Sequence, residues 1–465
     1  MKNICLLFLV IVGLWACEND LFIDPITEKS VSNFFESEIE IEEAINGVYS
    51  TLQFRGLYNL YIPAIGEIPS DNTFDEVPAN DGGRYGQLDE FTTITSNDII
   101  TDIWKDSYIG IQQTNVVLNR IEAIPFQEEN IRNARIGELK FIRALLYFNL
   151  VRIYGDVPLV IEETTDPTIY FGQGRTPLIE VYSQIQKDLT ESIPLLPLEA
   201  DDPGRVIKTA AEGLLAKVKL TLADYEGAKS LLESVINSGR HELMENPGAV
   251  FELENELNKE IIFAVQFASG LNGNTEGSQA FVQFSPSGTV NGAKGHNLPT
   301  RDFIAMFDEE DLRKEAYIGL TSQGTPFTKK YKAPTTVPND GPSDWIVLRY
   351  ADVLLMMAEV ENQLNNLSSA AIYLDQVRNR SGLANTTANT TSEMEKAIEL
   401  ERRFELIGEG HRWFDLLRSE KAISTMNDWF SKNGINISID DHDLLYPIPQ
   451  SQINTDPALT QNPGY

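Results

Sequence analysis

Glu405 and Glu409, two glutamates four residues apart, are the residues in this sequence that most resemble a catalytic pair. Glycoside hydrolases use two carboxyl groups about 5 to 10 Å apart, one as an acid and one as a base or nucleophile. The chain holds 69 acidic residues, so a neighbouring pair carries little specificity. Asp415, Arg412 and Arg418 follow at helical spacing and fit ion pairs along a helix. We therefore expect these residues to form a structural seam, meaning a row of ion pairs that supports the fold. Hydrolysis by a carboxylate pair is an alternative.

Other catalytic and metal-binding patterns do not occur in the sequence. The histidines, His241, His296, His411 and His442, are scattered and never form the H-E-x-x-H pair of a zinc peptidase. The turn at residues 441–443, Asp-His-Asp, could contact a cation, but a solvated turn is the simpler interpretation. Neither a G-x-S-x-G elbow nor a Walker A loop is present. We therefore expect no enzyme activity, no bound metal and no cofactor.

Binding without catalysis asks for a different mixture of residues, and two loop-rich segments supply it. Sugar rings place their apolar faces on aromatic side chains, while Asp, Asn or Arg nearby satisfies the hydroxyl groups. The candidate ligand-binding residues are Asp71, Asn72, Phe74, Arg84, Tyr85, Phe284 and Tyr331, with Phe281 beside them. Each aromatic residue could instead anchor its loop on neighbouring helices. These positions are therefore hypotheses about the site.

The elements that must position these loops are helices, and residues 209–239 form the first of two similar helical pairs. Thr209 and Glu212 have the spacing of a capping box, and an apolar stripe at helical spacing follows them. Asp224 is the expected start of the second helix, and Gly239 is placed to end it in a left-handed conformation.

Residues 349–382 repeat this plan, with Ser368 as the expected cap of the second helix and Gly382 as its end. Helical pairs of this length, with small residues where the helices cross, are typical of tetratricopeptide-type stacking. Residues 138–154 are apolar on nearly every side and predict a buried central helix. Residues 393–418 predict another helix, which the glycines at 408 and 410 should break.

Two long segments, residues 58–96 and 269–342, lack the helical period and are rich in Gly, Asn, Pro and Thr. Residues 260–267 and 345–348 are plausible short strands at their edges. The sequence thus predicts a mainly α fold. We expect a tetratricopeptide-like helical-repeat scaffold, whose long irregular loops and few short strands form the ligand-binding part.

The N-terminus carries an export signal. Lys2, an apolar run at residues 4–14 and the small residue Ala16 precede Cys17, and the run is too short to span a bilayer. The pattern resembles a bacterial lipoprotein signal, in which residues 1–16 are removed and Cys17 is lipidated. An ordinary secretory signal with an incidental cysteine is the alternative. Because Cys5 leaves with the signal, no intramolecular disulfide is expected.

Charge limits the class of partner. The chain has 37 basic and 69 acidic residues, a formal net charge of −32, which repels nucleic acid and anionic lipid headgroups. A solvated, aggregation-resistant surface is the simplest reason for this charge. The length of the chain favours two packed lobes or a helical-repeat scaffold over one compact core.

Several ordered motifs resemble those of the SusD/RagB family of nutrient-binding outer-membrane lipoproteins. In the N-terminal half these are Trp104, Tyr108, Asn115, the Arg-Ala pair at 143–144 and the run YGDVP at 154–158. In the C-terminal half they are RYADVLL at 349–355, VRNRSGL at 377–383, ERRFEL at 401–406, EGHRWFDLLR at 409–418, YPIP at 446–449 and QNPGY at 461–465. The resemblance extends over the whole of residues 17–465.

This resemblance implies a lipid-anchored protein on the outer face of the outer membrane. Such a protein binds glycans and passes them to a SusC-like TonB-dependent transporter. A peptide-binding member of the same import system is one alternative, and a surface glycoside hydrolase is another. The resemblance also suggests an N-terminal part at 17–255 with the first binding insertion. A C-terminal part at 256–465 would hold the second insertion and the helical repeat.

Overall fold

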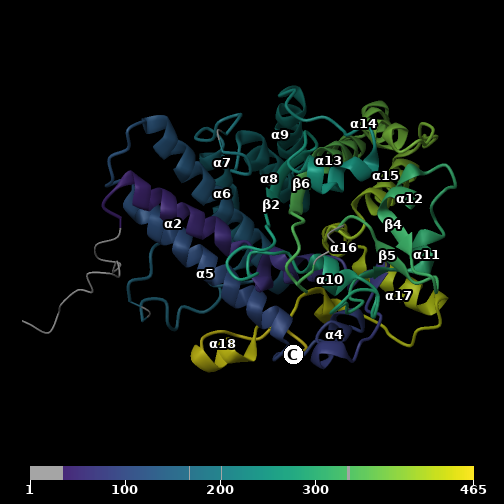
Figure 1. Cartoon of the computed structure of the whole chain (residues 1–465), viewed down its shortest axis with the longest axis horizontal. Coiled ribbons are helices and arrows are strands. Elements are labelled where there is room, and N and C mark those ends of the chain that lie inside the picture. Colours follow the sequence, from purple (N-terminus) through teal and green to yellow (C-terminus); the bar gives the residue numbers. More distant parts are fainter. Residues whose placement is uncertain (1–34, 167, 201, 332–335) are drawn as a thin grey trace, which may run out of the picture.

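Long helices make up most of the computed structural model, which describes residues 35–166, 168–200, 202–331 and 336–465. Figure 1 shows long helices at the left and along the top of the molecule, with β2 and β6 near its middle and β4 and β5 at the right beside α11 and α12. No helix of the described ranges is long and apolar enough to cross a lipid bilayer. The predicted leader 1–16 and Cys17 lie outside these ranges. The division of the chain at residue 255 stays a prediction.

Four long helices form one half of the molecule, on the left in Figure 1. They are α2 (Glu38–Thr51), α5 (Asp98–Ile121), α6 (Glu129–Tyr154) and α7 (Leu178–Ser192). α6 contacts the other three, and almost all of its second half is buried. The predicted central helix is therefore confirmed, although it begins earlier, at Glu129. It ends at Gly155, whose φ of 73° is left-handed.

The first predicted hairpin consists of α8 (Lys208–Thr221) and α9 (Tyr225–Asn237). The Asp224 carboxylate caps α9 by accepting a hydrogen bond from the main-chain N–H of Gly227 at 3.0 Å. Gly239 follows the helix with a φ of 63°. Both predicted ends of α9 are confirmed.

The predicted capping box of α8 is wrong, because the helix already begins at Lys208 and no side chain caps it. Both of its proposed members make tertiary contacts instead. The Thr209 hydroxyl lies 2.9 Å from Nε2 of His241, and the Glu212 carboxylate accepts a hydrogen bond from the Ser234 hydroxyl at 2.8 Å.

The second hairpin consists of α13 (Tyr350–Gln363) and α14 (Leu367–Arg380), and α13 also packs against α9 of the first hairpin. Ser368 does not cap α14: Asn366 occupies the cap position, and Ser368 lies within the first turn. Gly382, with a φ of 81°, follows the helix as predicted. The stacking of the two hairpins confirms the helical-repeat scaffold.

The predicted break near residue 408 separates α15 (Thr391–Leu406) from α16 (Arg412–Arg418). Gly408 and Gly410 both have positive φ, 75° and 79°, which a residue with a side chain rarely adopts. Two further helices complete the C-terminal region, α17 (Ala422–Lys432) and α18 (Gln450–Thr455).

The described residues form three short antiparallel strand pairs, two of which join distant parts of the chain. They are β1 (Thr73–Phe74) with β3 (Leu298–Pro299), β2 (Ile261–Val265) with β6 (Trp345–Arg349), and β4 (Ile318–Leu320) with β5 (Pro326–Thr328). The strands predicted at residues 260–267 and 345–348 are therefore present, and they pair with each other.

Besides β1, β3, β4 and β5, the described residues of the two irregular segments form only short helical turns. These turns are α3 (Tyr61–Ile65), α4 (Gly86–Asp89), α10 (Ala280–Phe284), α11 (Arg301–Ile304), α12 (Leu312–Tyr317) and a 3-10 turn at Asn80–Gly83. A π turn at Arg55–Asn59 leads into the first segment, and further 3-10 turns lie elsewhere at Pro247–Phe251, Leu253–Asn255 and Asp441–Leu444.

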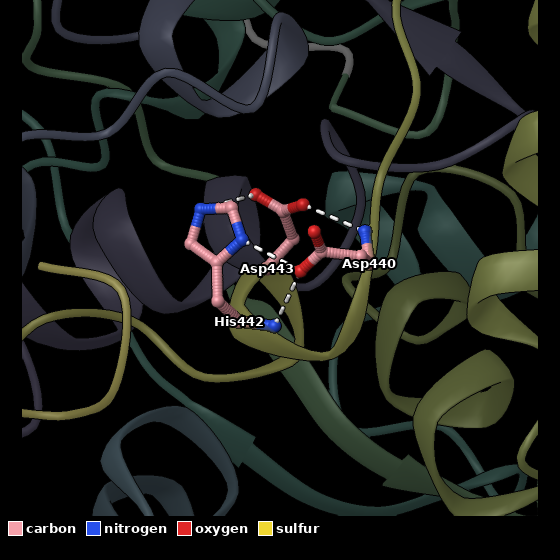
Figure 2. A group of neighbouring side chains, drawn as sticks. All are labelled: Asp440, His442 and Asp443. Atoms are coloured by element: carbon pink, nitrogen blue, oxygen red, sulfur yellow. Dashed lines mark hydrogen bonds and ion pairs between the residues drawn. The ribbon is translucent and has the colours of Figure 1, made fainter.

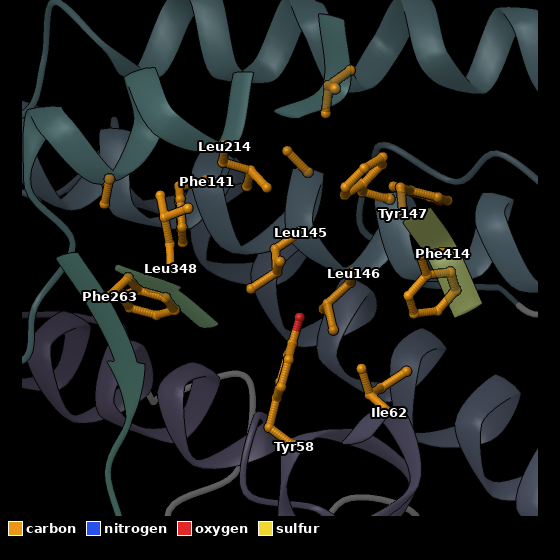
Figure 3. Close-up of a cluster of buried hydrophobic side chains, with 14 of the residues drawn as sticks. Tyr58, Ile62, Phe141, Leu145, Leu146, Tyr147, Leu214, Phe263, Leu348 and Phe414 are labelled. Atoms are coloured by element: carbon orange, nitrogen blue, oxygen red, sulfur yellow. The ribbon is translucent and has the colours of Figure 1, made fainter. Parts of the chain in front are cut away.

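The main hydrophobic core lies where α6, α8 and the β2–β6 pair meet (Figure 3). Phe141 of α6 packs edge to face on Phe263 of β2, with ring centroids 5.0 Å apart. Leu348 of β6 lies against Gly213 of α8, where a Cβ would approach its Cδ2 to 2.4 Å. Each large apolar side chain buried here contributes about 1.5–3 kcal/mol. This core fixes both hairpins to the central helix.

Asn462 and Arg175 cap the C-terminal end of α6, and we call these two residues the clamp. Nδ2 of Asn462 donates to the carbonyl oxygens of Tyr154 at 3.0 Å and of Tyr446 at 2.7 Å. Nη2 of Arg175 donates to the Asn462 side-chain oxygen at 2.6 Å and to the Tyr154 carbonyl at 3.0 Å. The last carbonyl of the central helix thus obtains its hydrogen bonds from residues distant in the sequence.

Candidate functional site

The two irregular segments meet and form one continuous loop surface. Residues Thr73 and Phe74 pair with Pro299 and Leu298 through β1 and β3. The Glu76 carboxylate accepts a hydrogen bond from the main-chain N–H of Ser287 at 2.7 Å. We call the surface formed by residues 74–84 and 286–294 the insertion face.

The buried side chain of His296 holds the insertion face together by contacting two of its aspartates. Nδ1 of His296 lies 2.8 Å from Oδ1 of Asp75, and its Nε2 lies 3.0 Å from Oδ2 of Asp81. The Tyr85 ring stacks on the imidazole, with centroids 3.6 Å apart and planes at 18°. Burial tends to raise the pKa of Asp81, but hydrogen bonds from His296 and Lys294 outweigh it and lower that pKa. The insertion face is therefore a supported surface.

Two of the predicted ligand-binding residues, Asp71 and Asn72, are buried and hold the first segment on α15 and α16. Asp71 accepts hydrogen bonds from Arg412 at 2.8 and 3.2 Å and pairs with Arg403 at 2.8 Å. The Asn72 side-chain oxygen accepts from Nε of Arg403 at 2.9 Å. Burial tends to raise the pKa of Asp71, yet the two arginines lower it.

Three predicted aromatic residues, Tyr85, Phe284 and Tyr331, are also buried. Tyr331 stacks on Trp345 with centroids 4.7 Å apart, and its hydroxyl donates to the Gly408 carbonyl. Phe284 packs edge to face on Tyr331, and Phe281 is half-buried against the main core. These side chains anchor their loops on the scaffold, which is the alternative the sequence left open. In this conformation they offer no exposed ring to a ligand.

Phe74 and Arg84 are the predicted ligand-binding residues that remain partly exposed at the insertion face. Nε of Arg84 donates to the Asp81 carbonyl at 2.7 Å, and its Nη1 lies 3.5 Å from the Asp98 carboxylate. Asp81 and Lys294, which the sequence did not single out, lie beside them and form an ion pair of 3.0 Å. No local signal marks this pair, because its members are 213 residues apart.

The carboxylates considered for catalysis, Glu405 and Glu409, belong to a buried ionic cluster. Arg349 binds Glu409 through Nε and Nη2, both at 2.8 Å, and Glu405 through Nη1 at 2.6 Å. Lys330 donates to Glu409 at 2.6 Å, and Arg380 pairs with Glu405.

Their protonation states do not suit acid catalysis. Burial tends to raise both pKa values, but Arg380 and Arg349 hold the pKa of Glu405 well below its usual value. Arg349 and Lys330 lower the pKa of Glu409 to about 2. A general acid for glycoside cleavage needs a raised pKa. The expected structural seam is therefore present.

Asp440, His442 and Asp443 converge at the start of a turn (Figure 2). Oδ1 of Asp440 accepts hydrogen bonds from the main-chain nitrogen of His442 at 2.9 Å and from its Nδ1 at 2.8 Å. Nε2 lies 3.3 Å from Asp443. The hydrogen bond that the His442 ring donates to the Asp440 carboxylate raises the pKa of His442. Both ring nitrogens face carboxylates, which fits a protonated, ion-paired turn better than a metal site, since a ligating nitrogen must be unprotonated.

Two family models match most of the chain. Residues 314–465 match the SusD family, and residues 22–220 match a family described as starch-binding associating with outer membrane. The chain belongs to the SusD/RagB family. The SusD-like protein P25 of Formosa agariphila is 26% identical to this SusD/RagB protein, over 100% of this chain and 99% of the relative.

Solved structures agree with this membership. A laminarin binding SusD-like protein has a TM-score of 0.80 at 26% identity and covers 92% of this SusD/RagB chain and 100% of its own. Surface glycan-binding protein A from Bacteroides thetaiotaomicron, in complex with laminarihexaose, has a TM-score of 0.78 at 22% identity, with 92% and 99% covered. The second likeness concerns the fold alone. The mainly helical fold expected from the sequence is that of the family.

Proposed function

We propose that this protein binds glycan chains on its insertion face and passes them, uncleaved, to a SusC-like TonB-dependent transporter. The observation that carries the proposal is the link from His296 to Asp75 and Asp81, which joins two distant segments into one supported surface. A preformed surface loses little conformational entropy on binding. Phe74 would face a sugar ring, while Arg84 and Asp81 would bind hydroxyl groups.

Laminarin is the first glycan to test, because the relative that binds it matches over almost the full length of both chains. Isothermal titration with laminarihexaose and affinity electrophoresis in laminarin gels measure this binding. The panel includes other oligosaccharides and short peptides. We expect binding to at least one glycan and to no peptide.

Phe74→Ala tests the insertion face. Loss of one stacking aromatic ring should weaken glycan binding about three- to tenfold. Ile372→Ala is the matched control, because Ile372 is 61% exposed on α14 and far in sequence from both segments. Equal affinity of Phe74→Ala and wild type would remove the insertion face from the proposal. Binding of peptides alone would favour the peptide-import alternative, and appearance of shortened glycans would favour the hydrolase.

Membrane attachment is the second part of the proposal. Each acyl methylene buried in a bilayer contributes about 0.8 kcal/mol, so two or more chains on Cys17 would anchor the protein stably. We expect Cys17→Ala to leave the membrane fraction and to lose co-purification with the transporter. Cys5→Ala, within the predicted leader, is the matched control and should remain anchored. Retention of Cys17→Ala at the cell surface contradicts this part.

A further inference from the structure

An open groove lies between α5, α18 and the segment that carries Tyr170 and Phe171, and it shares no residue with the insertion face. Its volume is about 540 Å³, within the range of small-molecule sites. Figure 1 shows α18 beside the end of α5. The groove uses none of the residues that sequence reasoning proposed for ligand binding.

Aromatic side chains form much of this groove. Trp104 and Tyr108 of α5 contribute to its lining, with ring centroids 5.2 Å apart. Phe171 lines the groove and is 60% exposed, and Tyr170 beside it is half-buried. An exposed aromatic residue of this size, next to a groove, is a feature of binding surfaces.

The polar side chains that line the groove and have no partner among the described residues are neutral. Among the described residues, the side chains of Gln113, Gln452 and Tyr170 make no hydrogen bond, and all three line the groove. The charged lining residues are paired within the protein. Lys105 lies 3.2 Å from Asp102, and Asp456 accepts hydrogen bonds from the main-chain nitrogens of Gly172 and Ala458 at 2.9 and 3.0 Å.

The walls are fixed before any ligand arrives. Nε of Arg175 donates to the Asp156 carbonyl at 2.7 Å, at the base of the wall that carries Phe171. The Tyr108 hydroxyl donates to the Pro158 carbonyl at 2.7 Å. The bond between Asp456 and Gly172 ties the same wall to α18. A ligand would therefore meet aromatic faces and amide groups already held in place.

We propose that this groove is a second glycan-binding site, in which Phe171 and Tyr170 face sugar rings and Gln113 and Gln452 bind hydroxyl groups. An uncharged sugar chain suits free amides and aromatic rings, whereas a charged peptide would find the local charges already paired. The inference rests on the proposed function only for its class of ligand. Two sites on one protein would raise the apparent affinity for a long glycan by avidity.

Phe171→Ala and Gln452→Ala test the groove in the full-length mature protein, and Ile169→Ala is the matched control. Ile169 is 62% exposed on the same segment but does not line the groove. Titration with laminarihexaose, and with the tightest-binding glycan of the panel, gives the number of sites. We expect two equivalents of wild-type affinity for wild type and Ile169→Ala. Phe171→Ala and Phe74→Ala should each keep one equivalent at that affinity and bind the other about three- to tenfold more weakly. Apparent affinity for polymeric laminarin should fall at least tenfold in Phe171→Ala.

The other outcomes separate this inference from the proposed function. One equivalent in wild type that Phe74→Ala weakens and Phe171→Ala leaves unchanged overturns the groove and leaves the proposed function standing. Binding that depends on Phe171 alone supports the groove and overturns the insertion face. Absence of any glycan binding overturns both. Unchanged glycan stoichiometry in Phe171→Ala, together with loss of transporter co-purification, assigns the groove to a protein partner and overturns the inference.

Discussion

The carbonyl oxygen of Gly410 occupies the place where a side chain on Gly66 would begin. A Cβ built on Gly66 would lie 2.1 Å from this oxygen, far inside van der Waals contact. The Gly66 carbonyl in turn accepts a hydrogen bond from the main-chain N–H of Trp413 at 2.9 Å. The start of the first irregular segment therefore packs directly on the break between α15 and α16.

Gly66→Ala should destabilise the protein by about 1–3 kcal/mol or more, because backbone must move to admit the methyl group. Chemical denaturation followed by circular dichroism measures the change. Gly47→Ala is the control: this glycine lies within α2, and a Cβ there would meet no atom within 4 Å. The control should be neutral or stabilised by up to about 1 kcal/mol. Equal stability of the two variants contradicts the close contact.

Arg349→Met should cost about 3–5 kcal/mol, because it leaves Glu405 and Glu409 buried with fewer positive partners. The midpoint of urea unfolding reports the loss. Arg301→Met, which removes an exposed arginine, should change this midpoint little. A small effect at Arg349 would show that the remaining basic residues of the cluster compensate.

Glu67 should make stability decrease as pH rises from 4.5 to about 7. Burial raises its pKa from 4.5 to about 7, although main-chain N–H groups of Gly410 and His411 donate to its Oε2 at 3.0 and 3.2 Å. The folded state therefore holds a proton that the unfolded state releases in this window, with a slope of up to about 1.4 kcal/mol per pH unit.

Glu67→Gln should remove this part of the pH dependence, because the amide keeps the acceptor oxygen and cannot ionise. Free energies of unfolding at pH 5 and pH 8 give the comparison. Glu43→Gln, at an exposed position of α2, should keep the wild-type profile. Identical profiles for Glu67→Gln and wild type would show that Glu67 is ionised throughout.

His296→Ala should loosen the insertion face, since it leaves Asp75 and Asp81 without their shared partner and removes the ring under Tyr85. Hydrogen–deuterium exchange by mass spectrometry should show faster exchange in residues 75–85 and 294–297. His442→Ala, which alters the exposed turn, should leave these peptides unchanged. Protection equal to wild type in His296→Ala would mean that β1 and β3 hold the face alone.

The helical scaffold could be predicted because its signals are local. In α9, the apolar period lies within the helix, and the Asp224 cap and Gly239 lie directly beside its two ends. The capping box at Thr209 failed because a short pattern cannot show that His241 and Ser234 engage both of its members. A local sequence pattern predicts the role of a side chain correctly only where no residue distant in the sequence binds that side chain instead.

The candidate site could be located but not resolved into residues. Composition marked both irregular segments, and the structure joins them. Composition could not separate Tyr85 and Tyr331, which pack inward, from Phe74, which remains partly exposed. Loops have no period that assigns a residue to the buried or the exposed face. The pairing of His296 with Asp75 joins residues 221 positions apart, and single-sequence patterns do not report such distances.

The clamp on the end of α6 has a consequence for biosynthesis. The carbonyl of Tyr154 is capped by an asparagine that leaves the ribosome 308 residues later. During synthesis the Tyr154 carbonyl can therefore gain its hydrogen bond from Arg175 early, but its second hydrogen bond forms only after Asn462 has been made. Chains cut short before that position would lack both hydrogen bonds from Asn462, and we expect quality-control proteases to degrade them faster than complete chains.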